Sequence, residues 1–262
     1  DIPGNQDGRK IFVSGNYAYV ASTDNNQELQ VVNVSNPASP SLSGSVNLSG
    51  NNDAYSVFVD GLTLYLGRDS SGNPELYVYS LASPASPSLI GSINLADDAN
   101  DVYVFGGYAY VATPNNSQEL VVVDVSLPNT LSQVASLDLP GNDDAFAVTG
   151  FGTTVFVGRS AGQFRVVNVS SPTSPSAIGF YDTTDNVNDL FADESSNLVF
   201  VANDANSAEF QVIDVSSLSS PSLFGSLNLP SDLSGVFYVS GVDRVFGVGD
   251  DNSEEFVIIQ PQ

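Results

Sequence analysis

Five aspartates recur at matching places along the chain and could together present oxygen ligands to a cation. They are Asp7, Asp53, Asp98, Asp144 and Asp232, with Asn186 in the corresponding place of the remaining repeat. Carboxylate oxygens are hard ligands of the kind that Ca²⁺ prefers, so one interpretation is a calcium site. The other is structural, since a loop aspartate commonly accepts backbone N–H groups of its own loop. No segment has the spacing of a calcium-binding loop, and both interpretations stay open.

Few other residues could carry out catalysis. The 262 residues include no histidine, cysteine, methionine or tryptophan. This composition excludes Ser-His-Asp and thiolate catalysis and argues against zinc or copper sites. Glycoside hydrolysis needs only two carboxylates, but there is no Trp for sugar stacking and no sialidase-type repeat. We therefore expect a protein that is not an enzyme.

The chain that positions these residues consists of six copies of one unit. A first series of apolar segments has starts 46, 45, 46, 44 and 46 residues apart: YAYVA (17–21), TLYLG (63–67), YAYVA (108–112), TVFVG (154–158), LVFVA (198–202) and RVFGV (244–248). A second series follows, as in ELQVVNVS (28–35) and ELVVVDVS (119–126), and usually leads into a Pro/Ser turn and a further strand. Each unit thus predicts four short strands rich in Val, Tyr, Phe and Ile.

The two middle strands of each unit are apolar at nearly every position, so both faces of the sheet must be covered. Four-stranded units of about 45 residues, stacked around an axis, form a β-propeller. We predict an all-β, six-bladed β-propeller of four-stranded antiparallel blades, with no helix. Residues 1–262 are predicted to form one propeller, with units at about 9–53, 54–99, 100–144, 145–187, 188–233, and 234–262 plus 1–8.

Several of these segments resemble a known family. ELVVVDVSLP (119–128), FQVIDVS (210–216) and GNYAYVA (15–21) are similar to the LVIVD repeats of bacterial and archaeal surface propellers. The resemblance covers all six units, although LYVYSLA (76–82) lacks the acidic residue and the sixth unit stops early. It implies a secreted or cell-surface β-propeller and assigns little chemistry.

The chain is strongly acidic. Thirty acidic residues against six basic ones give a formal net charge of −24. This charge repels phosphates, so we expect neither nucleic acid nor an anionic membrane as a partner. Because strands alternate in direction, 21 of the 30 acids fall in or beside loops at the same end of the blades. We therefore predict one strongly negative face.

The sixth unit is predicted to lack its outer strand. Asp1, Ile2 and Pro3 align with residues 47–49, at the end of an outer strand, whereas the sixth unit stops after Phe256, Val257, Ile258 and Ile259. These two segments form the predicted assembly edge. The N-terminus could close the last blade of its own chain, or a neighbouring copy could complete it. We favour the second, with copies joined head to tail in a filament.

The expected function follows from these features. The missing initiator methionine indicates a processed N-terminus, most simply by removal of a secretory signal. We expect an extracellular, cell-surface structural protein that assembles with copies of itself and does not insert into a membrane. The alternative is a cell-surface ligand-binding or adhesive propeller with an acidic, Ca²⁺-binding face that takes surface glycans or proteins. Ca²⁺ is the one cofactor that the acidic loops suggest.

Overall fold

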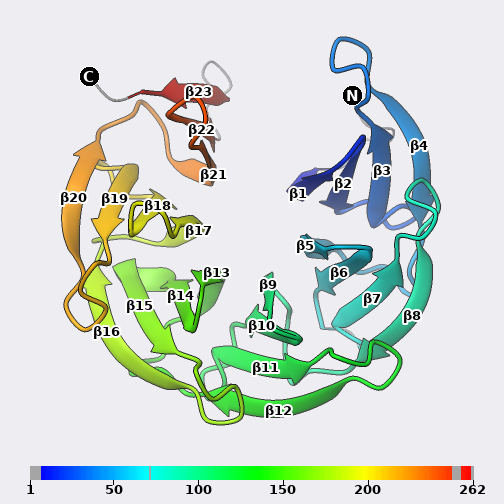
Figure 1. Ribbon diagram of the computed structural model, residues 1–262, viewed down its shortest axis with the longest axis horizontal. Helices are drawn as coiled ribbons and strands as arrows, with labels where there is room; N and C mark the ends of the chain where they lie inside the picture. The colour runs from blue at the N-terminus through cyan, green and yellow to red at the C-terminus, as the bar shows by residue number, and fades with distance from the viewer. Residues whose placement is uncertain (1–6, 71, 250–254, 261–262) are drawn as a thin grey trace. The chain divides into compact units, whose positions relative to one another are not determined.

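The fold is described by a computed structural model for residues 7–70, 72–249 and 255–260 (Figure 1). Six antiparallel sheets follow one another in chain order, five with four strands and the last with three. They are the blades of an all-β, six-bladed propeller, as predicted. The strands are β1 Gly8–Ser14, β2 Tyr17–Ser22, β3 Leu29–Asn33, β4 Ser41–Val46; β5 Ala54–Asp60, β6 Thr63–Arg68, β7 Leu76–Ser80, β8 Ser88–Ile93; β9 Asp101–Phe105, β10 Tyr108–Ala112, β11 Leu120–Asp124, β12 Ser132–Leu137; β13 Ala145–Phe151, β14 Thr154–Arg159, β15 Gln163–Asn168, β16 Ser176–Asp182; β17 Val187–Asp193, β18 Leu198–Asn203, β19 Phe210–Asp214, β20 Ser222–Leu227; β21 Leu233–Val239, β22 Arg244–Gly249 and β23 Phe256–Ile259.

The chain folds as two compact units that divide within the third sheet. The first unit comprises residues 1–115 and 121–134, and the second comprises residues 116–120 and 135–262.

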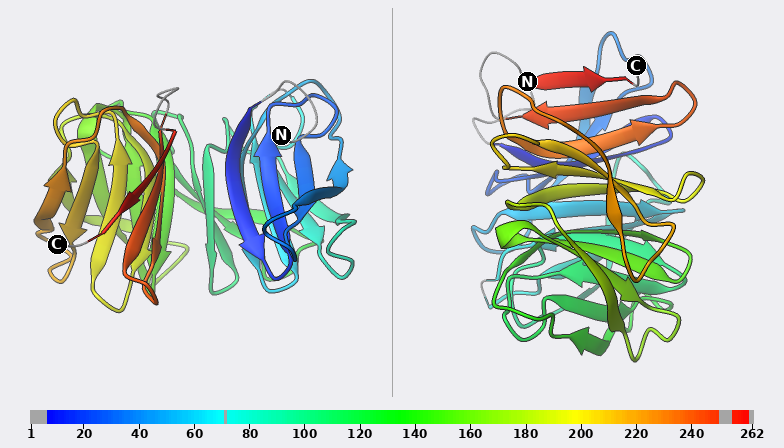
Figure 2. Two further views of the ribbon diagram at one scale, coloured as in Figure 1. Left: turned by 90° about the horizontal axis from the view of Figure 1, so that it is seen from above. Right: turned by 90° about the vertical axis from the view of Figure 1, so that its left-hand side faces the viewer.

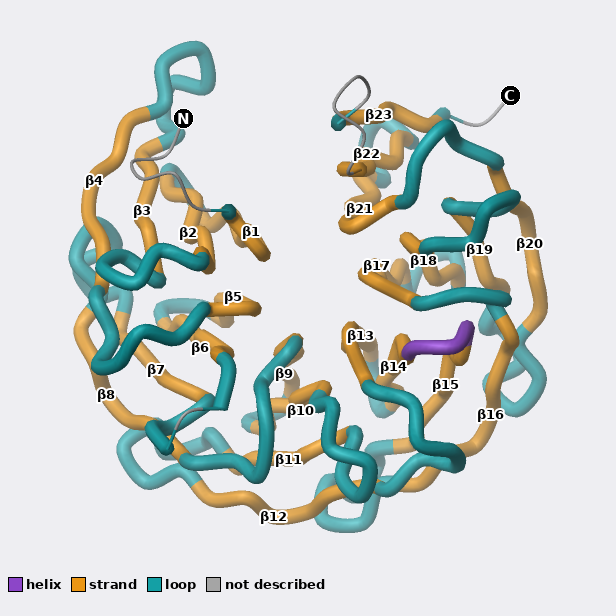
Figure 3. The backbone as a smooth tube through the Cα atoms, turned by 180° about the vertical axis from the view of Figure 1, so that it is seen from behind, coloured by secondary structure: helices purple, strands orange, loops and turns teal. Residues whose placement is uncertain are grey.

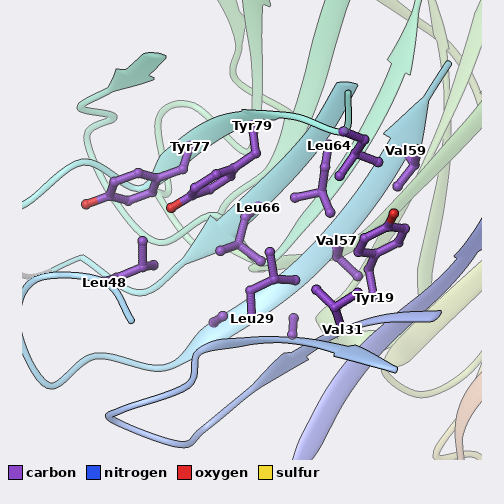
Figure 4. Close-up of a cluster of buried hydrophobic side chains, with 13 residues drawn as sticks. Tyr19, Leu29, Val31, Leu48, Val57, Val59, Leu64, Leu66, Tyr77 and Tyr79 are labelled. Atoms are coloured by element: carbon purple, nitrogen blue, oxygen red, sulfur yellow. The ribbon is translucent and has the colours of Figure 1, made fainter. Parts of the chain in front are cut away.

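The core of the first unit lies between successive sheets. Tyr19 and Val31 of the first sheet pack against Val57 and Leu66 of the second (Figure 4). The middle strands β6 and β7 are buried at almost every position, because each has a neighbouring sheet on both faces. The outer strands β4 and β8 are largely exposed. This pattern explains why the middle strands are uniformly apolar and the outer strands are rich in serine.

The second unit is built in the same way, and its last three sheets stack face to face (Figure 2). Phe191 on β17 and Phe237 on β21 occupy matching positions, and their ring centroids lie 4.8 Å apart. In the first unit, Phe12 on β1 and Phe58 on β5 are 5.1 Å apart at the same position. Edge-to-face contacts of this kind add to the stability gained by burial. The recurring aromatic residues therefore hold neighbouring sheets together.

One helical turn interrupts the β structure, where the sequence predicted none. It is a 3₁₀ turn, η1, at Ser160–Gly162 between β14 and β15 (Figure 3). Ala161 within it has φ 54°, in the left-handed region. The turn arises where the loop GRSAGQ (158–163) is shorter than its counterparts. Within the described residues, the protein has no helix of the length and hydropathy needed to cross a bilayer.

A glycine recurs at the bulge of the outer strands for a steric reason. A Cβ atom on Gly44 would collide with the carbonyl oxygen of Ala85, which lies in the turn before the outer strand of the next sheet. A Cβ atom on Gly91 or Gly179 would collide in the same way with Pro128 or Leu218. The turns of the second, third and fifth sheets therefore pack directly against the outer strand of the sheet before them.

Candidate assembly edge and acidic loops

The predicted assembly edge contains an edge strand, β23. Among the described residues β23 pairs only with β22, with Phe256 opposite Val248 and Ile258 opposite Phe246. Phe256 and Ile258 are 58% and 57% exposed, whereas Val257 and Ile259 pack toward the core of the last two sheets. The edge thus combines unpaired backbone groups with exposed apolar side chains. Asp1, Ile2 and Pro3, the other half of the predicted edge, lie outside the described residues.

A second feature marks the same place. On β20, the outer strand of the fifth sheet, Gly225 occupies the position of the three glycines that contact the next sheet. Among the described residues, nothing lies within 4 Å of a Cβ atom built on Gly225. The neighbouring Phe224 is 69% exposed. The outer side of the fifth sheet is therefore shaped to receive a turn that the described residues do not supply.

Four glutamates close the outer strands of their own sheets. Each directly precedes the third strand and accepts the backbone N–H of a residue twenty positions later, just after the outer strand. The bonds are Leu48 to Glu28 (2.8 Å), Leu95 to Glu75 (2.5 Å), Leu139 to Glu119 (2.9 Å) and Leu229 to Glu209 (2.6 Å). All four glutamates are at most 3% exposed. In the fourth sheet Gln163 stands at this place, and Thr183 instead donates to the carbonyl of Gly162.

These glutamates correct one prediction from the sequence. Glu28, Glu75, Glu119 and Glu209 were expected to contribute to a strongly negative face, but the structure buries them. A glutamate between a polar loop and an apolar strand looks like a solvated loop residue. The signal that could have found its role is the pairing of Glu before the third strand with Leu twenty residues later.

Two arginines, also missed by the sequence analysis, join sheets at this end. Arg159, the last residue of β14, is fully buried and donates to the carbonyls of Asp143 (3.0 Å) and Pro140 (2.9 Å). Its Nη2 lies 3.4 Å from the carboxylate of Glu119 in the preceding sheet. Two of only six basic residues end the second strand of their sheets, and this matched placement was a visible signal.

Arg68, the last residue of β6, is the counterpart of Arg159 but has fewer partners. It is fully buried and donates to the carbonyl of Ser49 at 3.1 Å. Its Nε and Nη2 atoms, and Oε1 of Glu28, are buried without a hydrogen-bond partner among the described residues. Burial raises the pKa of Glu28, and the Arg68 charge partly opposes the rise. The guanidinium of Arg159 thus has several hydrogen-bond partners, whereas that of Arg68 in the matching position has fewer.

The sixth sheet holds a fifth glutamate of this type, Glu255, directly before β23. In the first, second and fifth sheets the last residue of the second strand donates its N–H to the glutamate carbonyl, as Arg68 does to Glu75 (2.9 Å). Gly249 donates to the Glu255 carbonyl in the same way at 3.1 Å. The backbone of Glu255 is therefore placed like that of its counterparts, but its side chain is exposed.

The five candidate metal ligands lie in the loops that lead into the first strand of their sheets. Asp7, Asp53, Asp144 and Asp232 directly precede β1, β5, β13 and β21, and Asp98 lies three residues before β9. Within the part of the chain that is described, no three acidic side chains are grouped so as to hold a metal ion.

The backbone and side chains of these aspartates take part in bonds between loops. The carboxylate of Asp98 accepts the N–H of Ser70 at 2.6 Å, and the N–H of Asp144 donates to the hydroxyl of Ser160 at 2.9 Å. The amide of Asn186 accepts from Ala161 at 3.1 Å. These contacts join the loop before the first strand to the loop after the second. They join different loops, whereas the structural interpretation expected bonds within one loop, and both that interpretation and calcium binding stay predictions.

Six repeated sheets, four of them with the outer strand tied back by a glutamate side chain, define a repeat protein of the β-propeller class. The LVIVD repeat pattern matches residues 6–48, 96–138, 148–183 and 195–228, which together make up more than half of the sequence. The chain therefore belongs to the LVIVD repeat family, as the resemblance implied. No curated protein matches it significantly.

Several solved structures share the fold. A protein from Lactobacillus plantarum has 12% identity and a TM-score of 0.78, and the match covers 97% of this chain and 84% of that chain. A functionally unknown protein from Desulfotomaculum acetoxidans has 13% identity and a TM-score of 0.78 over 99% and 84% of the two chains. The computationally designed Ika8 protein has 11% identity and a TM-score of 0.67 over 94% and 69%. Identities this low show the fold alone.

Proposed function

We propose that this protein is a non-enzymatic, extracellular structural protein whose copies join head to tail into a surface filament. The observation that carries the proposal is the edge strand β23, which has neighbouring strands on only one side among the described residues. Natural proteins usually protect such edges, because unpaired backbone groups promote pairing with other chains. Here the edge instead carries exposed Phe256 and Ile258.

The faces of the first and last sheets support this proposal. Ile11 and Val13 on β1 are 60% and 57% exposed, whereas their counterparts Val57 and Val59 on β5 are 2% and 7% exposed. Likewise, the counterparts of Phe256 and Ile258 on β3 are fully buried. Between the first two sheets, the β3 face with Leu29 and Val31 packs against the β5 face with Val57 and Val59. The exposed face of β23 corresponds to the first of these, and the exposed face of β1 to the second. Contact between them in different copies joins unlike surfaces, which builds a ring or an open filament.

The acidic composition fits a role outside the cell. A net charge of −24 keeps single copies apart in dilute solution, and salt weakens this repulsion. The regular repeat and the lack of histidine and cysteine suit a scaffold better than a catalyst. Surface labelling of intact producing cells tests the location, and exclusive labelling after lysis would contradict it.

Assembly is tested by electron microscopy and sedimentation of the concentrated protein at several salt concentrations. We expect filaments in the wild type and their loss in Ile258→Ser, because a hydroxyl replaces an apolar contact at the edge. Leu89→Ser is the matched control, since Leu89 is also 57% exposed but lies on β8, which is already the outer strand of a complete sheet. Monodisperse single copies of the wild type under all conditions would refute the proposal.

A further inference from the structure

We propose that the carboxylate of Glu255 is the docking group for the N-terminal segment of a second copy, and that it accepts the backbone N–H of that copy's Ile2. This inference rests on the proposed head-to-tail assembly and names the contact that sets its register.

The first argument is the repeated bond in the other sheets. A glutamate directly before the third strand accepts the N–H of the residue that follows the outer strand in four sheets, at 2.5–2.9 Å. Glu255 holds the same place before β23, and the bond from Gly249 to its carbonyl fixes its backbone as in the first, second and fifth sheets. The acceptor is therefore in position, while β23 has no outer strand among the described residues.

The second argument is the sequence of the segment. Ile2, Pro3, Gly4 and Asn5 repeat the order Leu-Pro-Gly-Asn of residues 139–142, at the same distance before a first strand. Leu139 is the residue whose N–H donates to Glu119 at 2.9 Å. Ile2 thus carries the N–H that a glutamate of this kind accepts. Its apolar side chain also matches Leu139, which is fully buried.

The bond joins a charged acceptor to a backbone donor in a site that assembly would cover. Hydrogen bonds to charged groups contribute more than neutral ones, and their loss corresponds to about tenfold or more in an equilibrium constant. Because the acceptor belongs to one side chain, it also selects one register of the incoming segment. A slip by one residue would turn every side chain of that segment to the opposite face.

The experiment measures the critical concentration for filament formation of Glu255→Ala. We expect it to rise by about tenfold or more, although the variant removes a negative charge and general repulsion would then favour assembly. Glu194→Ala is the matched control, because it removes an exposed carboxylate away from β23. Glu255→Gln retains an acceptor oxygen and should restore part of the assembly.

Further assembly and melting measurements decide the inference. Deletion of residues 1–3 should weaken assembly as much as Glu255→Ala, and the two changes together should add little, as for two halves of one contact. The melting temperature of isolated copies should be the same for Glu255→Ala and wild type. If wild-type filaments form and Glu255→Ala assembles equally well, the inference fails and the proposed assembly stands. If Glu255→Ala lowers the melting temperature of isolated copies, the segment docks within its own chain and the inference is wrong.

Discussion

Replacing Arg159 by methionine tests the role of the buried guanidinium. The change keeps an unbranched side chain of similar length but removes the donors to Asp143, Pro140 and Gln163 and the ion pair with Glu119. Glu119 is fully buried and, within the described part of the chain, would keep its bond from Leu139. Removing one partner of a buried ion pair destabilises a protein by about 3–5 kcal/mol, because the other charge is left uncompensated.

For a chain of this size, that loss corresponds to a fall of about 6–20 °C in melting temperature. Thermal and urea unfolding, followed by far-UV circular dichroism and tyrosine fluorescence, would measure it. The matched variant is Arg68→Met, which removes the hydrogen bond to Ser49 and a 4.0 Å ion pair with Asp69, together with two buried nitrogens that lack hydrogen-bond partners among the described residues. We expect a loss of about 1–3 kcal/mol for that variant.

The comparison of the two variants decides whether the reasoning holds. Adding Glu119→Gln to Arg159→Met should recover part of the stability, because no buried charge is then left alone. Equal losses for Arg159→Met and Arg68→Met, or no recovery in the double variant, would refute the reasoning.

Three other predictions follow from the structure. Gly44→Ala should destabilise the fold by about 1–3 kcal/mol through its collision with Ala85, whereas Gly225→Ala should change the stability of isolated copies by less than about 0.5 kcal/mol but weaken assembly; equal thermal effects would contradict this. Burial raises the pKa of Glu75, so its contribution to stability is present below its unfolded pKa and is lost as pH rises through the folded value. Glu75→Gln should therefore be more stable than wild type at pH 7 and similar to it near pH 4, and urea unfolding at both pH values would detect a failure of this trend. Both NaCl and Ca²⁺ should raise the melting temperature by screening the acids, and a larger rise with Ca²⁺ at equal ionic strength would identify specific calcium binding.

The sequence predicted the sheets because period and composition act together. Segments such as YAYVA (17–21) are apolar throughout, and their near-constant spacing places a middle strand in every unit. The difference between the sixth unit and the others was equally visible, since nothing in residues 255–262 repeats the Pro/Ser turn, and the described residues of the sixth sheet form three strands. These features depend on local pattern, which a single sequence displays directly.

The buried polar contacts could not be predicted in the same way. The bond from Leu95 to Glu75 and the bonds of Arg159 to Asp143, Pro140 and Glu119 join residues sixteen to forty positions apart, and most of them involve a backbone atom. A backbone carbonyl or N–H has no signature in the sequence. Charged side chains are mostly exposed in proteins, whereas the fold buries both Glu75 and Arg159.

The two kinds of polar contact have different consequences for how such a gene can lengthen. A glutamate and its donor lie twenty residues apart within one four-stranded repeat. A duplicated repeat therefore carries this bond with it to any new place along the chain. The guanidinium of Arg159 needs Glu119 of the preceding sheet, and Arg68 faces Glu28 in the same relation. Duplication of a pair of units preserves both contacts, whereas insertion of a single unit between Glu119 and Arg159 would separate the charges. A new unit can therefore enter the array without separating these charges only where it does not fall within such a pair of sheets.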